Sequence, residues 1–199
     1  MKKLLKICLL LLLGLIVSSC NNDDLREPIE LPVNVTESDL DGKWIMESFI
    51  VADASVEFTF AGQTVPVDYR VQGENYNFSA IFSDETNTVT AEGSFDTVTV
   101  TSLPTGDQER KDTFAAENLI SPDSTWSIEN GNLIIAGSGS AEIIEFTGQS
   151  LTYQTDLSQP ELANLINQGF GLNEFNLKNP KGMMRVTLVK TTAGTDPLN

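Results

Sequence analysis

Apolar and polar residues alternate with a period of two along most of the chain between residues 39 and 190. Successive side chains of a β-strand point to opposite faces, so this alternation predicts half-buried strands. Clusters of turn residues separate the alternating segments, for example at 84–87. The Asn130-Gly131 pair supplies the two positive φ angles that a tight hairpin turn requires. The pattern therefore predicts an all-β protein of about nine or ten short strands joined by tight turns.

Three segments depart from this regular pattern. Val98 and Val100 have the opposite parity to the preceding strand residues, which predicts a bulge or a break near Asp96 and Thr97. Residues 104–111 are polar and are predicted to form a loop, while 114–122 has no clear assignment.

One short helix is predicted before the last strand, which is expected to begin at Met183. Ser158 and Glu161 form a capping box, and Pro160 lies in the first turn, where its missing N–H costs nothing. An apolar stripe follows, made by Leu162, Leu165 and Ile166.

A meander of hairpins has an exposed edge at each end unless it closes on itself. We therefore expect residues 39–190 to form one up-and-down antiparallel β-barrel of about eight to ten strands. An eight-stranded barrel either fills with side chains or holds one small ligand. The side chains expected to line a ligand site are Trp44, Met46, Tyr69, Phe78, Phe82, Trp126 and Tyr153. Further candidates are Phe58, Phe60 and Met184, of which the two phenylalanines fit the outer face equally well.

The first twenty residues have the layout of a secretory signal peptide. Three lysines lie within 2–6, and an apolar run of eleven residues follows at 7–17. That run is shorter than the roughly 20 residues needed to cross a bilayer. The sequence Val17-Ser18-Ser19-Cys20 resembles the lipobox of bacterial lipoproteins. The alternative is an ordinary signal peptide with a chance cysteine.

The lipobox resemblance implies acyl chains on Cys20, and two or three such chains hold a protein stably on a membrane. It implies a signal peptide at 1–19 and a mature chain that begins at Cys20. Composition and the strand pattern then divide the mature chain into a lipidated tether at 20–38, the barrel at 39–190 and a frayed end at 191–199. The expected location is the bacterial outer membrane, periplasmic or surface-exposed. The acidic run 21–24 resembles a surface-export signal and equally suits a solvated tether.

Charge and composition exclude several functions. The chain carries a net charge of −16, and loss of the three leader lysines leaves nine basic against 28 acidic residues. Such a balance opposes nucleic-acid binding. The absence of histidine excludes Ser-His and Cys-His catalysis. Asp39-Leu40-Asp41 lacks the remaining ligands of a calcium loop. We expect no enzyme, no cofactor and no metal.

The segment Gly42-Lys43-Trp44 resembles the Gly-x-Trp motif at the start of the lipocalin barrel. The segments 126–135, 142–147 and 151–153 are similar to small lipocalin-like domains of bacterial lipoproteins. The resemblance implies a late arginine packed over Trp44, and Arg185 is the candidate. In lipocalins the helix follows the last barrel strand, whereas the predicted helix precedes it.

Two functions remain open. The first is an envelope lipoprotein whose lipocalin-like barrel binds a small apolar or amphipathic ligand. The second is a solid barrel that acts on another envelope protein through its loops at 104–111 and 158–179.

Overall fold

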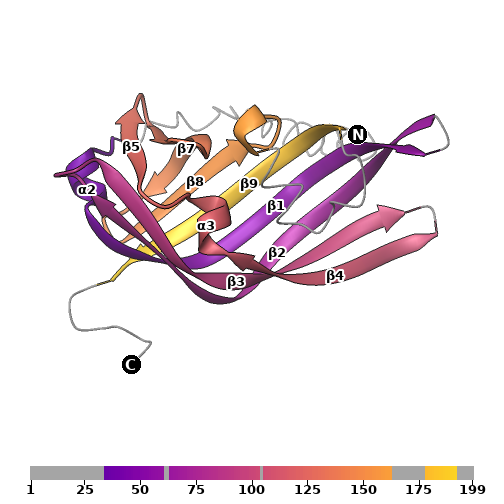
Figure 1. Cartoon of the computed structure of the whole chain (residues 1–199), viewed down its shortest axis with the longest axis horizontal. Helices are drawn as coiled ribbons and strands as arrows, with labels where there is room; N and C mark the ends of the chain where they lie inside the picture. Colours follow the sequence, from indigo (N-terminus) through magenta and orange to yellow (C-terminus); the bar gives the residue numbers. More distant parts are fainter. Residues whose placement is uncertain (1–33, 61–62, 104, 163–177, 192–199) are drawn as a thin grey trace, which may run out of the picture. The chain divides into compact units, whose positions relative to one another are not determined.

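The computed structural model describes residues 34–60, 63–103, 105–162 and 178–191. They belong to one compact unit, Val33–Asn199, and form a nine-stranded antiparallel sheet with two short α-helices (Figure 1). The predicted all-β class is confirmed. The predicted signal peptide, the lipidation site Cys20 and the predicted frayed end from 192 onward lie outside the described residues.

The strands differ widely in length. Helix α2 (Glu37–Leu40) precedes the sheet, α3 (Ala116–Leu119) lies between the fourth and fifth strands, and the 3-10 turn η1 (Pro160–Leu162) follows the eighth. In chain order the strands are β1 (Gly42–Phe60), β2 (Gln63–Ser83), β3 (Thr88–Leu103), β4 (Gly106–Ala115), β5 (Ser124–Glu129), β6 (Asn132–Ile135), β7 (Gly139–Phe146), β8 (Ser150–Asp156) and β9 (Lys178–Lys190).

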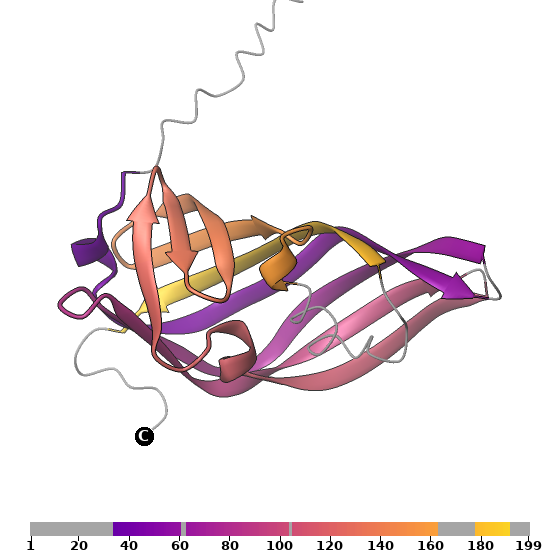
Figure 2. The same ribbon diagram turned by 45° about the horizontal axis from the view of Figure 1, so that its top comes forward.

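Eight of the nine strands close into a ring. Chain neighbours pair from β5 through β9, β9 pairs with β1, β1 with β2, and β2 with β3. The pairs Thr88–Thr125 and Val89–Ser124 join β3 to β5 and complete the ring. Strand β4 pairs with β3 alongside this ring (Figures 1 and 2). A strand that pairs on both sides has no free edge. Closure removes such edges from the ring, which is the physical advantage of a closed sheet.

Strands β1 to β3 are longer than the predicted short strands, at 19, 21 and 16 residues. A bulge was predicted in the chain near Asp96 and Thr97, and the prediction is wrong because these residues of β3 form no bulge. Strand β3 runs without a shift against β4, and the irregularity lies opposite, in β2 between Glu74 and Asn77. Thr97 is buried on the inner face while Val98 is half-buried on the outer face, so the polar residue takes the position that the pattern assigned to an apolar one.

The predicted loop at 104–111 is also wrong, because strand β4 begins at Gly106. Its residues from Gly106 to Lys111 are all exposed. A strand that is exposed on both faces buries no apolar side chains, so the alternation of apolar and polar residues gave no sign of β4. Of the predicted helix, the structure describes the 3-10 turn Pro160–Leu162; Leu165 and Ile166 lie outside the described residues.

Trp44 ties α2 and β9 to the start of β1. Its indole N–H donates to the carbonyl oxygen of Leu40 at 2.8 Å, and both side chains are fully buried. The Lys190 ammonium lies 5.3 Å from the Trp44 ring centroid and donates to the carbonyl oxygen of Asp39 at 3.0 Å. The expected cation, Arg185, is instead exposed and donates to Gln154 Oε1 at 3.3 Å. A cation over tryptophan contributes roughly 0.5–2 kcal/mol.

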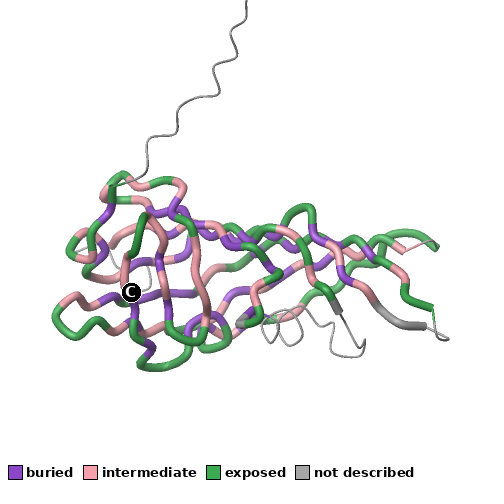
Figure 3. Tube along the Cα trace, turned by 90° about the horizontal axis from the view of Figure 1, so that it is seen from above, coloured by how far each residue is buried: buried purple, intermediate pink, exposed green. Residues whose placement is uncertain are grey.

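Buried positions alternate with exposed ones along the strands (Figure 3). Many of the buried side chains are aromatic. Phe95 is the centre of the largest group. Its ring centroid lies 4.9 Å from that of Phe49, 5.2 Å from Phe114 and 6.2 Å from Phe78. All four side chains are buried, and each such pair adds about 0.5–1.5 kcal/mol beyond the burial of its area.

Gly93 marks a close approach of β2 to β3. A Cβ atom there would lie 1.8 Å from the carbonyl oxygen of Asn77, and φ is +87°. Gly148 has a similar φ of +80° with nothing within 4 Å of its Cβ position. We expect Gly148→Ala to cost about 1–2 kcal/mol from backbone strain. Gly93→Ala should cost at least about 2 kcal/mol more, because the clash adds to the strain.

Urea unfolding of both variants measures this difference. Equal losses of unfolding free energy in Gly93→Ala and Gly148→Ala would mean that β2 and β3 do not approach so closely.

Candidate functional site

The seven side chains expected to line a ligand site are all buried inside the sheet. Their exposed fractions are Trp44 0%, Met46 4%, Tyr69 4%, Phe78 3%, Phe82 1%, Trp126 3% and Tyr153 5%. They pack into the same core rather than around one space, and the Phe82 and Trp126 ring centroids are 5.0 Å apart. Of the further candidates, Met184 is buried, and the side chains of Phe58 and Phe60 lie outside the description.

A small, partly open pocket of about 30 Å³ lies beside Tyr153, with Leu162 and Met184 in its wall. One water needs about 10–15 Å³ of such space, so this pocket holds about two waters. Burial raises the pKa of Tyr153 far above its usual range, so the phenol stays neutral. Burial raises the pKa of Tyr69 in the same way. This space is too small for a lipid.

A larger space opens where β1 and β2 part. Their pairing is interrupted between Ile45–Ser79 and Ile50–Gln72, so four residues of β1 face six of β2. The two additional residues also disturb the pairing of β2 with β3, between Glu74 and Asn77. A bulge of this kind bends its strand and separates it from its neighbour. The sheet is therefore open at this one place, while β1 and β2 are paired on both sides of it.

Tyr76 bridges the interruption. Its hydroxyl accepts a hydrogen bond from the Phe49 N–H at 3.0 Å and donates one to the Gly73 carbonyl oxygen at 2.8 Å. A Cβ atom at Gly73 would lie 2.6 Å from this hydroxyl, so glycine is needed for the contact. Partial burial, more than any other influence, raises the pKa of the Tyr76 phenol. The Tyr76 hydroxyl thus joins β1 to β2 at a place where no backbone pairing joins them.

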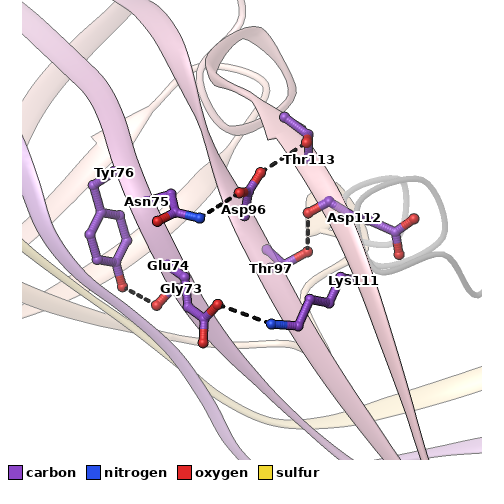
Figure 4. Close-up of polar contacts among 9 residues, drawn as sticks. All are labelled: Gly73, Glu74, Asn75, Tyr76, Asp96, Thr97, Lys111, Asp112 and Thr113. Atoms are coloured by element: carbon purple, nitrogen blue, oxygen red, sulfur yellow. Dashed lines mark hydrogen bonds and ion pairs between the residues drawn. The ribbon is translucent and has the colours of Figure 1, made fainter.

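Polar contacts hold the bulge to β3 and β4 (Figure 4). Asp96 accepts hydrogen bonds from the Asn75 amide at 2.8 Å and from the Thr113 hydroxyl at 2.9 Å. These two bonds hold the pKa of the Asp96 carboxyl below its usual value. Asn75 itself has a φ of +50°, which asparagine tolerates better than most residues. Lys111 and Glu74 add an exposed ion pair at 3.4 Å.

A groove lies at the Ile45–Ser79 end of the interruption, with a volume of about 290 Å³. The buried side chains of Met46 and Phe78 form its apolar floor, which they reach because β1 and β2 have separated. Polar groups from Asn77 and Ser79 line the wall. The complete lining is Lys43, Ile45, Met46, Tyr76, Asn77, Phe78, Ser79, Glu92 and Gly93.

Two opposite charges flank this groove. Lys43 on β1 is half-buried and Glu92 on β3 is exposed. Ile45, Ser79 and Glu92 form one cross-strand row, and Lys43 lies in the next row on the same face. Neither charge takes part in an ion pair within the described residues. The groove therefore combines an apolar floor, polar walls and two charges of opposite sign that are available to a ligand.

The residues that the structure describes contain no group of three or more Cys, Asp or Glu side chains placed to hold a metal ion. No helix in the described ranges has the length and apolarity needed to span a membrane.

Neither a scan against models of protein families nor searches of the curated proteins and of the solved structures found a match to this chain.

Sequence reasoning found the two residues of the groove floor but not the groove. Met46 and Phe78 were predicted as ligand-lining, whereas Lys43, Ser79 and Glu92 were not. The available signal was the presence of Gly73, Asn75 and Gly93 in the middle of long strands, where glycine and asparagine mark bulges and close approaches.

Tyr76→Phe removes the hydroxyl that bridges β1 and β2. We expect a loss of about 1–3 kcal/mol in unfolding free energy, because the Phe49 N–H and the Gly73 carbonyl lose their partner. Tyr153→Phe is the matched control, since its hydroxyl makes no hydrogen bond among the described residues. That variant should unfold within about 0.5 kcal/mol of the wild type.

Chemical unfolding followed by tryptophan fluorescence measures both variants. A Tyr76→Phe protein as stable as Tyr153→Phe would show that the bridge contributes nothing to joining the two strands.

Proposed function

We propose that this chain is a lipid-anchored envelope protein whose lipocalin-like barrel binds a small amphipathic molecule. The observation that carries the proposal is the groove between β1 and β2, which has an apolar floor and a polar, charged rim. Small-molecule sites combine largely apolar walls with a few polar groups that orient the ligand. The binding place proposed is the groove in the wall of the sheet, because the pocket beside Tyr153 holds only about two waters.

The lipocalin-like assignment draws on sequence and structure together. Gly42 and Trp44 match the Gly-x-Trp motif, and eight strands close into a ring. Lys190 lies over Trp44 at the position that the resemblance gives to a late arginine. The proposed anchor at Cys20, the outer-membrane location and the absence of catalysis rest on the sequence alone.

A second candidate is the solid-barrel protein that acts on another envelope protein. The packing of the interior favours it, because aromatic side chains occupy the space where a lipocalin-type ligand would lie. Of its two proposed contact segments, 106–111 belongs to the exposed strand β4, while 163–177 lies outside the described residues. The two candidates differ in whether any small molecule reaches the groove.

The anchor is tested by metabolic labelling. Cells fed labelled palmitate should incorporate it into the wild-type chain and not into Cys20→Ala, because the thiol is the proposed acylation site. Cys8→Ala is the matched control and should label normally. Equal labelling of the wild type and Cys20→Ala would end the lipoprotein proposal.

Binding is tested with decanoate, an amphiphile of a size that suits the groove, on the full chain carrying 13C-methyl methionine. We expect the Met46 methyl signal to shift. The Met184 methyl signal, which reports on the pocket beside Tyr153, should keep its chemical shift. Ile45→Asp should weaken binding about tenfold or more by placing a charge in the groove wall. Ile50→Asp, at an exposed position of the same strand, should have no effect.

A shift of the Met184 signal without a shift of the Met46 signal would mean that the ligand binds in the pocket beside Tyr153 and not in the groove. Binding unchanged by Ile45→Asp, or no shift in either methyl with any amphiphile, would favour the solid-barrel candidate.

A further inference from the structure

We propose that the groove selects small zwitterions that carry an apolar group, such as free amino acids with aromatic or branched side chains. Their carboxylate pairs with Lys43, their ammonium pairs with Glu92, and the apolar group rests on Met46 and Phe78. This inference rests on the proposed function, since it names the ligand class of the same groove.

The two charges suit such a ligand better than they suit each other. Lys43 and Glu92 lie two strands and one cross-strand row apart. With strands about 4.8 Å apart and about 3.4 Å per residue, their backbones are about 12 Å from each other. Ile81 and Ser79 of β2 stand between them, so a direct ion pair requires both side chains to lie flat across the groove. A zwitterion between them, with one ion pair at each end, spans most of this separation, so each side chain leans only part of the way toward the ligand.

The described neighbourhood supplies neither charge with another partner. The cross-strand neighbour of Lys43 on β2 is Ile81, and on its other side the Thr191 N–H donates to the Lys43 carbonyl oxygen at 3.0 Å; the neighbour of Glu92 on β2 is Ser79. The Lys190 ammonium is itself engaged with Trp44 and with the carbonyl oxygen of Asp39. A carboxylate at Lys43 and an ammonium at Glu92 therefore add attraction without displacing an existing ion pair.

Hydrogen bonding adds direction to this charge complementarity. The Ser79 hydroxyl and the Asn77 amide line the same wall, and neither side chain is hydrogen-bonded within the described residues. Both groups can donate to a carboxylate and accept from an ammonium. Ligand pockets typically hold a few such groups, which fix orientation while apolar contact supplies most of the affinity.

The volume sets the size of the ligand. A cavity of about 150 Å³ holds benzene, and the groove has about 290 Å³. A molecule of about a dozen heavy atoms therefore fits within the groove, and this is the size of an aromatic amino acid. Decanoate has a similar size but offers nothing to Glu92.

The probe is L-phenylalanine, titrated into the full chain in lipid nanodiscs with 13C-methyl methionine as reporter. We expect the Met46 methyl to shift and Met183, exposed on β9, to remain unchanged. N-acetyl-phenylalanine lacks the ammonium and phenylalanine amide lacks the carboxylate, and each should bind at least about fivefold more weakly.

Two substitutions test the residues. Lys43→Gln should weaken phenylalanine binding at least fivefold while leaving the affinity for phenylalanine amide unchanged. Glu92→Gln should weaken it similarly while leaving the affinity for N-acetyl-phenylalanine unchanged. Lys181→Gln and Glu109→Gln, exposed on β9 and β4, are the matched controls and should bind as the wild type does.

The outcomes separate the two levels of the proposal. If decanoate shifts Met46 but phenylalanine does not, or if both charge variants bind phenylalanine normally, the zwitterion inference is overturned and the amphiphile site stands. If neither probe shifts the Met46 signal in a protein that is shown to be folded by its cooperative unfolding, both the inference and the proposed function are wrong.

Discussion

The structure depends on a mismatch between two adjacent strands. Six residues of β2 must pass four residues of β1 between two correctly paired segments. The excess bends β2 away from β1, and a tyrosine hydroxyl then joins the strands where backbone pairing fails. Because unpaired backbone groups are costly inside a sheet, the bulge persists only with this substitute and with the Asp96 contacts that fix its other side. The groove is the space left by that arrangement.

The inside of the ring and its wall have taken different roles. Aromatic rings gathered around Phe95 pack the interior beneath the bulge, and the pocket beside Tyr153, lined by residues that the structure describes, has room for about two waters. A filled core stabilises the closed sheet by dispersion and apolar burial. In the proposed function recognition therefore takes place at the surface, where the opened wall presents Met46 and Phe78 together with charged and polar groups.

Period-two alternation predicted the interior residues well, because parity alone determines which face a side chain joins. All seven predicted lining residues are buried. The same rule failed where a strand carries little apolar burial, as in the exposed segment of β4, and where polar residues are buried, as at Thr97. The cation over Trp44 was assigned to Arg185 because the lipocalin resemblance implies a late arginine, whereas the structure places the Lys190 ammonium there.

The sequence by itself determined the all-β class, the turn positions, the inward face of most strands and the low basic charge of the domain. Those properties depend on neighbouring residues and on composition. Only the tertiary structure decided the closure through β3 and β5, the position of the bulge in β2 rather than β3, and the groove beside it. These depend on the register between strands distant in the chain, and register is a property of pairs of strands that neither strand carries alone.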